Sequence, residues 1–242
     1  MRRLLFLGCG AVLALLAPVS GWAGASGAPP SADALLTEAQ DAAEQAQSVH
    51  FLDKATAGKV SQELAGALSA PAAAESLKGS EPLEVELVNG VLYVSGSVPA
   101  LESALQLTAS QANAAGGKWV VVHQGDSPFQ SIAQLLTVSG EVANFFPSRQ
   151  TVKMGNRTKV HGIAVYPLYG RPAAPLPKGS SGSVALFVPV KAPYLPVGAT
   201  LVIGSSSTKT RLHEAVAFTD LFQSVNIAPP ASNTVAFKTV VG

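Results

Sequence analysis

The chain has 242 residues, of which 48% are hydrophobic and only 13% are charged, and its formal net charge is +1 at pH 7. A nearly neutral chain with so few charges lacks the basic surface that nucleic-acid binding needs, so no nucleic-acid partner is expected. The single cysteine excludes an internal disulfide.

Residues 1–25 predict a cleavable signal peptide. Arg2 and Arg3 precede an uncharged apolar run, and small residues follow it at the spacing for cleavage after Ala23 or Ala25. The run is shorter than a membrane span usually needs, although an uncleaved anchor stays open as an alternative. The exported chain is expected in the periplasm or associated with the outer membrane, and cleavage also removes the only thiol.

Residues 26–55 predict a linker followed by a helix. Small and apolar residues recur at helical spacing over Ser31–Val49, and Ser31 suits the N-cap position. The same spacing predicts a second helix over Thr56–Leu68, which Pro71 would end.

The clearest local signal is a β-hairpin. Apolar and charged residues alternate over Leu83–Val88, as in a half-buried strand, and Val91–Val94 returns as its partner. Between them stands Asn89-Gly90, a pair that favours the positive φ angles of a type I′ turn.

A helix and a strand complete this region. Ser97 and Pro99 suit a helix start, and Gly116-Gly117 suits its end. Lys118–His123 then predicts a strand. Residues 56–123 therefore indicate the order helix–strand–strand–helix–strand, with both helices on one face of a small sheet.

Residues 127–242 predict a β-rich domain whose topology the sequence leaves open. It begins with a short helix near Phe129, and a further helix is predicted over Thr210–Val225. A Pro/Gly-rich segment at 167–196 favours turns and sheet edges. The predicted strands are Thr137–Ala143, Gln150–Met154, Thr158–Tyr166, Ser183–Val190, Ala199–Ile203 and Thr234–Val241. The fold class is thus α+β, a small αββαβ module (residues 56–126) followed by this β-rich domain.

The first module resembles the BON domain of bacterial envelope proteins. The resemblance rests on the segment VELVNGVLYVSG (residues 85–96) with Gly90 and Gly96, on Val98, and more loosely on the later AGGKWVVV (residues 115–122). It implies an envelope module thought to bind phospholipid or hydrophobic surfaces. The same element order also resembles the ring-building modules of secretion and sporulation machines, which pack against copies of themselves.

Two aromatic residues are the candidate surface contacts. Tyr93 and Trp119 lie on predicted strands, and if exposed together they would form an apolar patch suited to a lipid or a partner subunit. Five further residues are expected to define turns and the fold rather than to bind: Asn89, Gly90, Gly96, Gly116 and Gly117.

No constellation with catalytic chemistry is present. The four histidines do not have metal-ligand spacing, and no nucleophile-elbow or phosphate-loop motif occurs. No catalytic residue, metal or cofactor is therefore expected, and the chain is not expected to be an enzyme.

The sequence predicts an exported, non-enzymatic binding or scaffolding module. Its expected partners are an envelope lipid, another envelope protein or a second copy of the chain. Two alternatives remain at this stage: a periplasmic subunit of a secretion, pilus or conjugation apparatus, and a periplasmic enzyme with an unmarked site.

Overall fold

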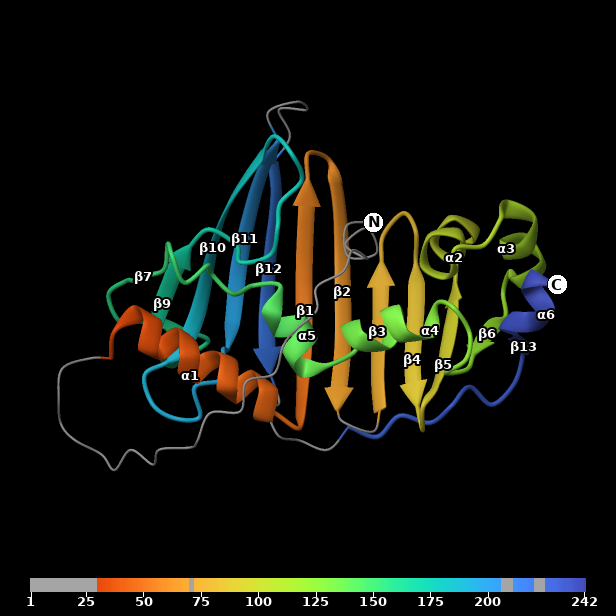
Figure 1. Ribbon diagram of the computed structural model, residues 1–242, viewed down its shortest axis with the longest axis horizontal. Helices are drawn as coiled ribbons and strands as arrows, with labels where there is room; N and C mark the ends of the chain where they lie inside the picture. Colours follow the sequence, from red (N-terminus) through yellow and green to blue (C-terminus); the bar gives the residue numbers. More distant parts are fainter. Residues whose placement is uncertain (1–29, 70–71, 206–210, 220–224) are drawn as a thin grey trace.

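The computed structural model describes residues 30–69, 72–205, 211–219 and 225–242, and a β-sheet spans the molecule (Figure 1). Within these ranges there are thirteen strands, all in one sheet, and six helices. The strands are β1 (Ser48–Ala57), β2 (Val60–Ser69), β3 (Ala72–Lys78), β4 (Leu83–Val88), β5 (Val91–Gly96), β6 (Trp119–Val122), β7 (Lys153–Met154), β8 (Thr158–Val160), β9 (Ile163–Gly170), β10 (Ser180–Pro189), β11 (Gly198–Ser205), β12 (Arg211–Thr219) and β13 (Thr234–Ala236). The helices are α1 (Ala32–Gln45), α2 (Val98–Leu105), α3 (Ala109–Ala115), α4 (Phe129–Leu135), α5 (Val138–Ala143) and α6 (Phe237–Val241).

Two antiparallel meanders form this sheet, and they meet at its centre. The strand order is β13-β6-β5-β4-β3-β2-β1-β12-β11-β10-β9-β7, with β8 paired to β9. Only β13 and β6 run parallel among the recorded pairs. Because β1 pairs with β12, the regions predicted as 56–126 and 127–242 contribute strands to the same sheet. The predicted α+β, β-rich class is confirmed, whereas the αββαβ arrangement is not observed.

The predicted helix over Thr56–Leu68 is wrong. These residues form the end of β1, a turn and most of β2, whose ten residue pairs make one long hairpin. The neighbouring strand β3 follows directly and was not predicted at all. These residues form strands and not a helix because strands pair with both outer edges of the hairpin: β12 pairs with β1, and β3 pairs with β2.

Two further segments have the opposite structure to the one predicted. Arg211–Thr219 is the central strand β12 and not a helix; the rest of that predicted helix lies partly outside the described residues. Val138–Ala143 is helix α5 and not a strand, and Thr137 caps it by accepting a 3.0 Å hydrogen bond from the Gly140 amide.

The first predicted helix and the β4–β5 hairpin are confirmed. Helix α1 begins after Ser31, whose hydroxyl accepts a hydrogen bond from the Ala34 amide, and it ends at Gln45. The hairpin has the predicted Asn89-Gly90 turn, with φ angles of 51° and 75°. Both positions thus have the left-handed backbone that this residue pair tolerates.

The helix predicted after Ser97 is divided in two. Helix α2 ends at Leu105, its C-cap Gln106 has a φ of 55°, and Thr108 starts α3 through a capping box with Gln111. Gly116 then follows α3 as its C-cap, and Gly117 has a φ of 71°. The chain enters β6 directly after them.

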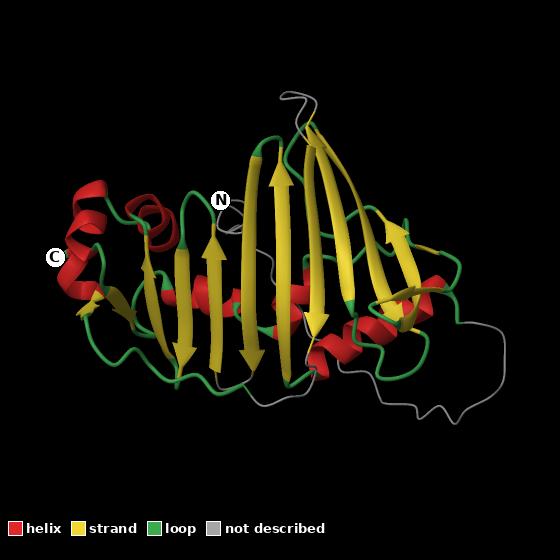
Figure 2. Cartoon of the chain, turned by 180° about the vertical axis from the view of Figure 1, so that it is seen from behind, coloured by secondary structure: helices red, strands yellow, loops and turns green. Residues whose placement is uncertain are grey.

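The helices lie mainly on one face of the sheet. In Figure 1, α1, α5 and α4 cross the lower half of the sheet, where β1 begins and β2 and β12 end. Figure 2 shows the opposite face from behind, with no helix drawn across the central strands. We call these the helix side and the bare face.

The C-terminal residues close one edge of the sheet. Residues 225–233 lead from the centre to the far edge, where β13 pairs with β6. The Trp119 amide donates a 2.9 Å hydrogen bond to the Asn233 carbonyl, and the Asn233 side chain donates to the Gly117 carbonyl. The buried Phe237 anchors α6. The predicted strand Thr234–Val241 is therefore a strand only in its first three residues.

Candidate functional site

Strand alternation gives the helix side an apolar surface that continues above the helices. In the lower half, its residues include Val49, Phe51 and Leu68, which are almost fully buried. In the upper half, the positions that face the same side alternate between apolar residues and the acidic residues Asp53, Glu75 and Glu214. We call its large apolar positions the apolar strip: Leu64, Leu77 and Leu212 are half-buried, whereas Leu201 and Ile203 are already buried, at 8% and 5% exposed.

The apolar strip has a boundary on two sides. Below it lie the helices, and beside it lies the loop between β9 and β10. The position of this loop follows from Gly182, where a Cβ atom would lie 3.0 Å from Leu176 Cδ1 and 3.2 Å from Pro172 Cγ. The Pro-rich segment thus packs on the helix side of β10. Between these boundaries Leu64, Leu77 and Leu212 are only half-buried.

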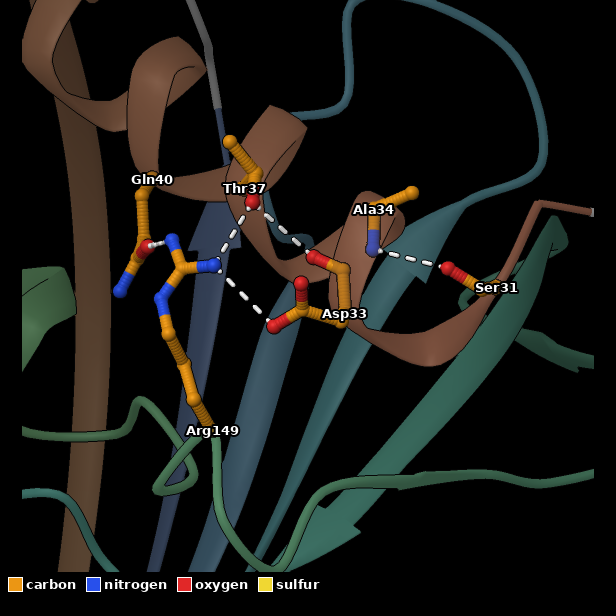
Figure 3. Close-up of polar contacts among 6 residues, drawn as sticks. All are labelled: Ser31, Asp33, Ala34, Thr37, Gln40 and Arg149. Atoms are coloured by element: carbon orange, nitrogen blue, oxygen red, sulfur yellow. Dashed lines mark hydrogen bonds and ion pairs between the residues drawn. The ribbon is translucent and has the colours of Figure 1, made fainter.

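Helix α1 covers the lower part of the helix side, and its position depends mainly on apolar burial. Leu35 and Leu36 are both 0% exposed, and burying one leucine contributes about 1.5–3 kcal/mol. On its outer side, α1 presents Asp33, Thr37 and Gln40 to Arg149, as Figure 3 shows.

The Arg149 guanidinium contacts all three of these side chains. Its Nη1 donates to Asp33 Oδ1 at 3.1 Å and to Thr37 Oγ1 at 2.9 Å, and its Nη2 donates to Gln40 Oε1 at 2.5 Å. Because the ion pair with Asp33 is exposed, it adds at most about 1 kcal/mol. Arg149 therefore orients α1, whereas the two leucines hold it on the sheet.

The aromatic residues singled out from the sequence share the bare face. Tyr93 on β5 pairs with Val121 on β6, and Trp119 lies two residues before Val121, so all three side chains point to the same side. Tyr93 and Trp119 are both half-buried. A diagonal pair on neighbouring strands is within reach of large aromatic side chains.

Glu86 lies beside this aromatic pair, directly opposite Tyr93. Its Oε2 atom is buried and accepts no hydrogen bond in the described part of the chain. Burial raises the pKa of the Glu86 carboxyl above its ordinary value, and the nearby Glu84 carboxylate raises it further. The sheet therefore holds an unfavourable negative charge at this position when Glu86 is ionised.

Glu86→Gln is expected to raise the free energy of unfolding at pH 7, by up to about 1 kcal/mol, because it replaces a poorly solvated carboxylate by a neutral amide. Between the pKa of the unfolded chain and the raised folded pKa, the unfolded chain loses its proton first, so stability falls as pH rises. Urea unfolding across this pH range should show a smaller fall for Glu86→Gln. The exposed Glu44→Gln should behave like the unchanged protein, and equal pH slopes for all three would contradict the expectation.

The residues that were expected to define turns and the fold lie in turns or at close backbone contacts. Gly96 lies where a Cβ atom would be 2.7 Å from the Pro82 carbonyl oxygen. Asn89 and Gly90 line a shallow pocket of about 480 Å³ together with Leu87, Gln124, Phe129, Gln130, Ala133, Gln134 and Thr137. Four of these side chains are carboxamides, and none of the nine is ionisable.

The histidines do not gather into a metal site in the described part of the chain. Among the described residues there is no cluster of three histidine, cysteine or acidic side chains that could hold a metal ion. His50 and His213 lie on the bare face, six residue pairs apart along the β1–β12 ladder, and His161 occupies a distant hairpin turn. No helix in the described ranges is long and apolar enough to span a membrane.

Comparison with known proteins shows a similarity in fold alone. No family model and no curated protein matches the chain. Among solved structures, LprF from Mycobacterium bovis is 15% identical with a TM-score of 0.51, over 83% of this chain and 97% of that one. Lipoprotein LppX from Mycobacterium tuberculosis is 14% identical with a TM-score of 0.48, over 81% and 98%. A DUF1329 family protein from Desulfovibrio piger is 10% identical with a TM-score of 0.31, over 81% and 93%.

These findings correct the resemblance to the BON domain and to ring-building modules. The element order that both resemblances shared requires a helix at residues 56–68, where the structure has the β1–β2 hairpin, and the LprF-like likeness extends over most of the chain. Only the β4–β5 hairpin and the elements that follow it matched the inferred pattern.

Proposed function

We propose that this is a non-enzymatic envelope protein that binds the acyl chains of a lipid on the apolar strip. One observation supports the proposal: Leu64, Leu77 and Leu212 stay half-buried on the helix side beyond the helices, on a face that they share with Asp53, Glu75 and Glu214. A surface of this kind would gain about 25 cal/mol for each Å² of apolar area that a lipid chain removes from water.

Export is part of this proposal. Residues 1–25 would act as the signal peptide and direct the chain to the periplasm or to the outer membrane; they lie outside the described residues. The exported chain would have no thiol and has no recognisable catalytic motif, which narrows its expected partners to lipids and other proteins. Tyr93 and Trp119 remain a proposed second contact, for a lipid or protein partner on the bare face.

The test is binding of a fluorescent fatty acid to the protein purified after export. Leu64→Gln combined with Leu77→Gln should weaken binding at least about tenfold, since two cross-strand leucines of the apolar strip are lost. The matched control is Leu52→Gln: Leu52 is 38% exposed and lies on the bare face of the adjacent strand β1. It should bind as the unchanged protein does.

Two outcomes would count against this assignment. Unchanged affinity in a folded Leu64→Gln, Leu77→Gln variant would exclude the apolar strip. A loss of affinity in Tyr93→Ala or Trp119→Ala instead would move the lipid site to the bare face. Native mass spectrometry of the purified protein provides a second readout, because a bound lipid adds its mass.

A further inference from the structure

Charge is distributed very unevenly along this nearly neutral chain. No aspartate or glutamate lies between Glu141 and Glu214, although nine lysines and arginines do. Residues 30–141 have the opposite balance, with thirteen acidic and four basic side chains. The strands β7 to β10, at one end of the sheet, all come from the segment without acidic residues.

Three of these cations gather at the outer edge of the sheet. Lys153 lies on the edge strand β7, Lys159 lies on β8, and Arg157 lies in the short connection between them. All three are exposed, and the described part of the chain gives none of them an acidic partner. Arg149 is different, because its guanidinium is already engaged by Asp33.

The same edge exposes apolar side chains. Ile163 is 45% exposed and Tyr169 is 48% exposed, which makes them two of the five large apolar residues exposed within the described ranges. Both belong to β9, six residues apart, and alternation directs them to the bare face. Their pairing partners on that face are Val160 and Lys153.

Two local features fix these side chains at the surface. The turn His161-Gly162, with φ angles of 49° and 82°, joins β8 to β9 and places Ile163 beside the tip of the hairpin. Gly155 leaves room for the Tyr169 ring: a Cβ atom there would lie 2.6 Å from Tyr169 Cε2. The ring therefore lies next to the β7–β8 connection that carries Arg157.

We propose that this edge, formed by Lys153, Arg157, Lys159, Ile163 and Tyr169, docks on the surface of an anionic lipid bilayer. The cations would lie at the lipid phosphates, where each basic residue near an anionic surface contributes about 1 kcal/mol. Ile163 and the Tyr169 ring would enter the interfacial region, which suits an apolar body with a polar tip.

A bilayer fits this edge better than an acidic protein does. The exposed apolar residues are separated along one strand by about 20 Å, at 3.3 Å per residue. Lys153 pairs with Tyr169 on the bare face, whereas Lys159 pairs with Ala164 and points to the helix side of the same edge. That arrangement suits a flat, extended partner with a charged surface above an apolar layer. The edge is also distinct from the apolar strip, which lies on the helix side, so the inference does not rest on the proposed lipid site.

The experiment is co-sedimentation of the exported protein with vesicles. Binding should be clear with vesicles that contain phosphatidylglycerol and weak with phosphatidylcholine alone, and added salt should reduce it. Lys153→Gln, Arg157→Gln and Lys159→Gln together should weaken binding about a hundredfold, at about fivefold for each cation. Ile163→Ser should weaken it about tenfold.

The control keeps the change in net charge constant. Lys54→Gln, Lys59→Gln and Lys118→Gln remove three cations from the acid-rich part of the chain and should leave vesicle binding unchanged. The Leu64→Gln, Leu77→Gln variant should also bind vesicles normally, which separates docking from capture of lipid on the apolar strip.

Equal binding by the two triple variants would overturn the proposal. So would binding to a soluble polyanion, such as heparin, without binding to vesicles, since the partner would then be a charged macromolecule and not a membrane.

Discussion

Phe145→Ala is expected to lower the free energy of unfolding by about 4 kcal/mol. Phe145 follows α5 and is 0% exposed, and its ring meets the edge of the Phe218 ring at a centroid distance of 6.4 Å and an interplanar angle of 79°. Phe218 belongs to β12, so this ring pair joins the helical layer to the centre of the sheet. Truncation would remove the aromatic contact and leave a cavity that the surrounding strands cannot fill.

Urea unfolding of the exported protein measures this loss, and Phe187→Ala is the matched control. Phe187 lies on the bare face and is only half-buried, so removal of the same atoms should cost no more than about 2 kcal/mol. If the two variants lost equal stability, Phe145 would not be the contact that fastens the helices to the sheet.

The fold was predictable where one residue pair or one cap decides the local structure. Asn89-Gly90 permits a tight turn that few other pairs adopt, and the flanking alternation then sets both strands. Ser31 likewise marks the first turn of α1 because its hydroxyl has a backbone amide to accept from. These signals act over a few residues, so distant contacts do not override them.

Periodicity failed where one spacing fits two structures. Val60, Leu64 and Leu68 are four residues apart, which places them on one face of a helix and equally on one face of a strand. Leu212 and Val216 have the same spacing in β12. Alanine-rich sequence favours a helix locally, but the pairing of β1 with both β2 and β12 decides the outcome.

The candidate sites could be predicted only in part, for the same reason. Tyr93 and Trp119 were placed on correctly assigned strands, and the structure puts them on one face. The apolar strip was missed because three of its strands, β2, β3 and β12, had not been identified as strands. No local signal indicates that Leu64 and Leu77 face each other on the side of the sheet where Leu212 also lies, since only the register of the sheet gives these positions.

Net charge also concealed a feature that is visible in the sequence. A total near zero excluded a nucleic-acid surface, yet the chain divides into an acid-rich part and a segment with no acidic residue. The sum hides this division because the two parts nearly cancel. The order of charges along the chain, and not their total, indicates the basic edge at β7 to β9.

Gly66→Val is expected to lower the free energy of unfolding by about 3 kcal/mol, because the position opposite Phe51 has no space for a side chain. A Cβ atom at Gly66 would lie 2.3 Å from Phe51 Cε1 and 2.5 Å from Phe51 Cζ. Phe51 is 3% exposed and part of the core on the helix side, so its ring cannot simply turn into solvent. Either the ring leaves its rotamer or the β1–β2 pairing opens.

Gly204→Val is the control, because Gly204 also lies in a strand but a Cβ atom there meets only Ser181 Oγ, at 3.9 Å. It should leave stability unchanged or raise it slightly, since valine suits a strand better than glycine does.

Combining Gly66→Val with Phe51→Ala tests the cause directly. If the ring is the obstacle, the double variant should lose clearly less stability than the sum of the two single losses. Additive losses would show instead that Gly66 is needed for the backbone of β2 and not for the room it leaves to Phe51.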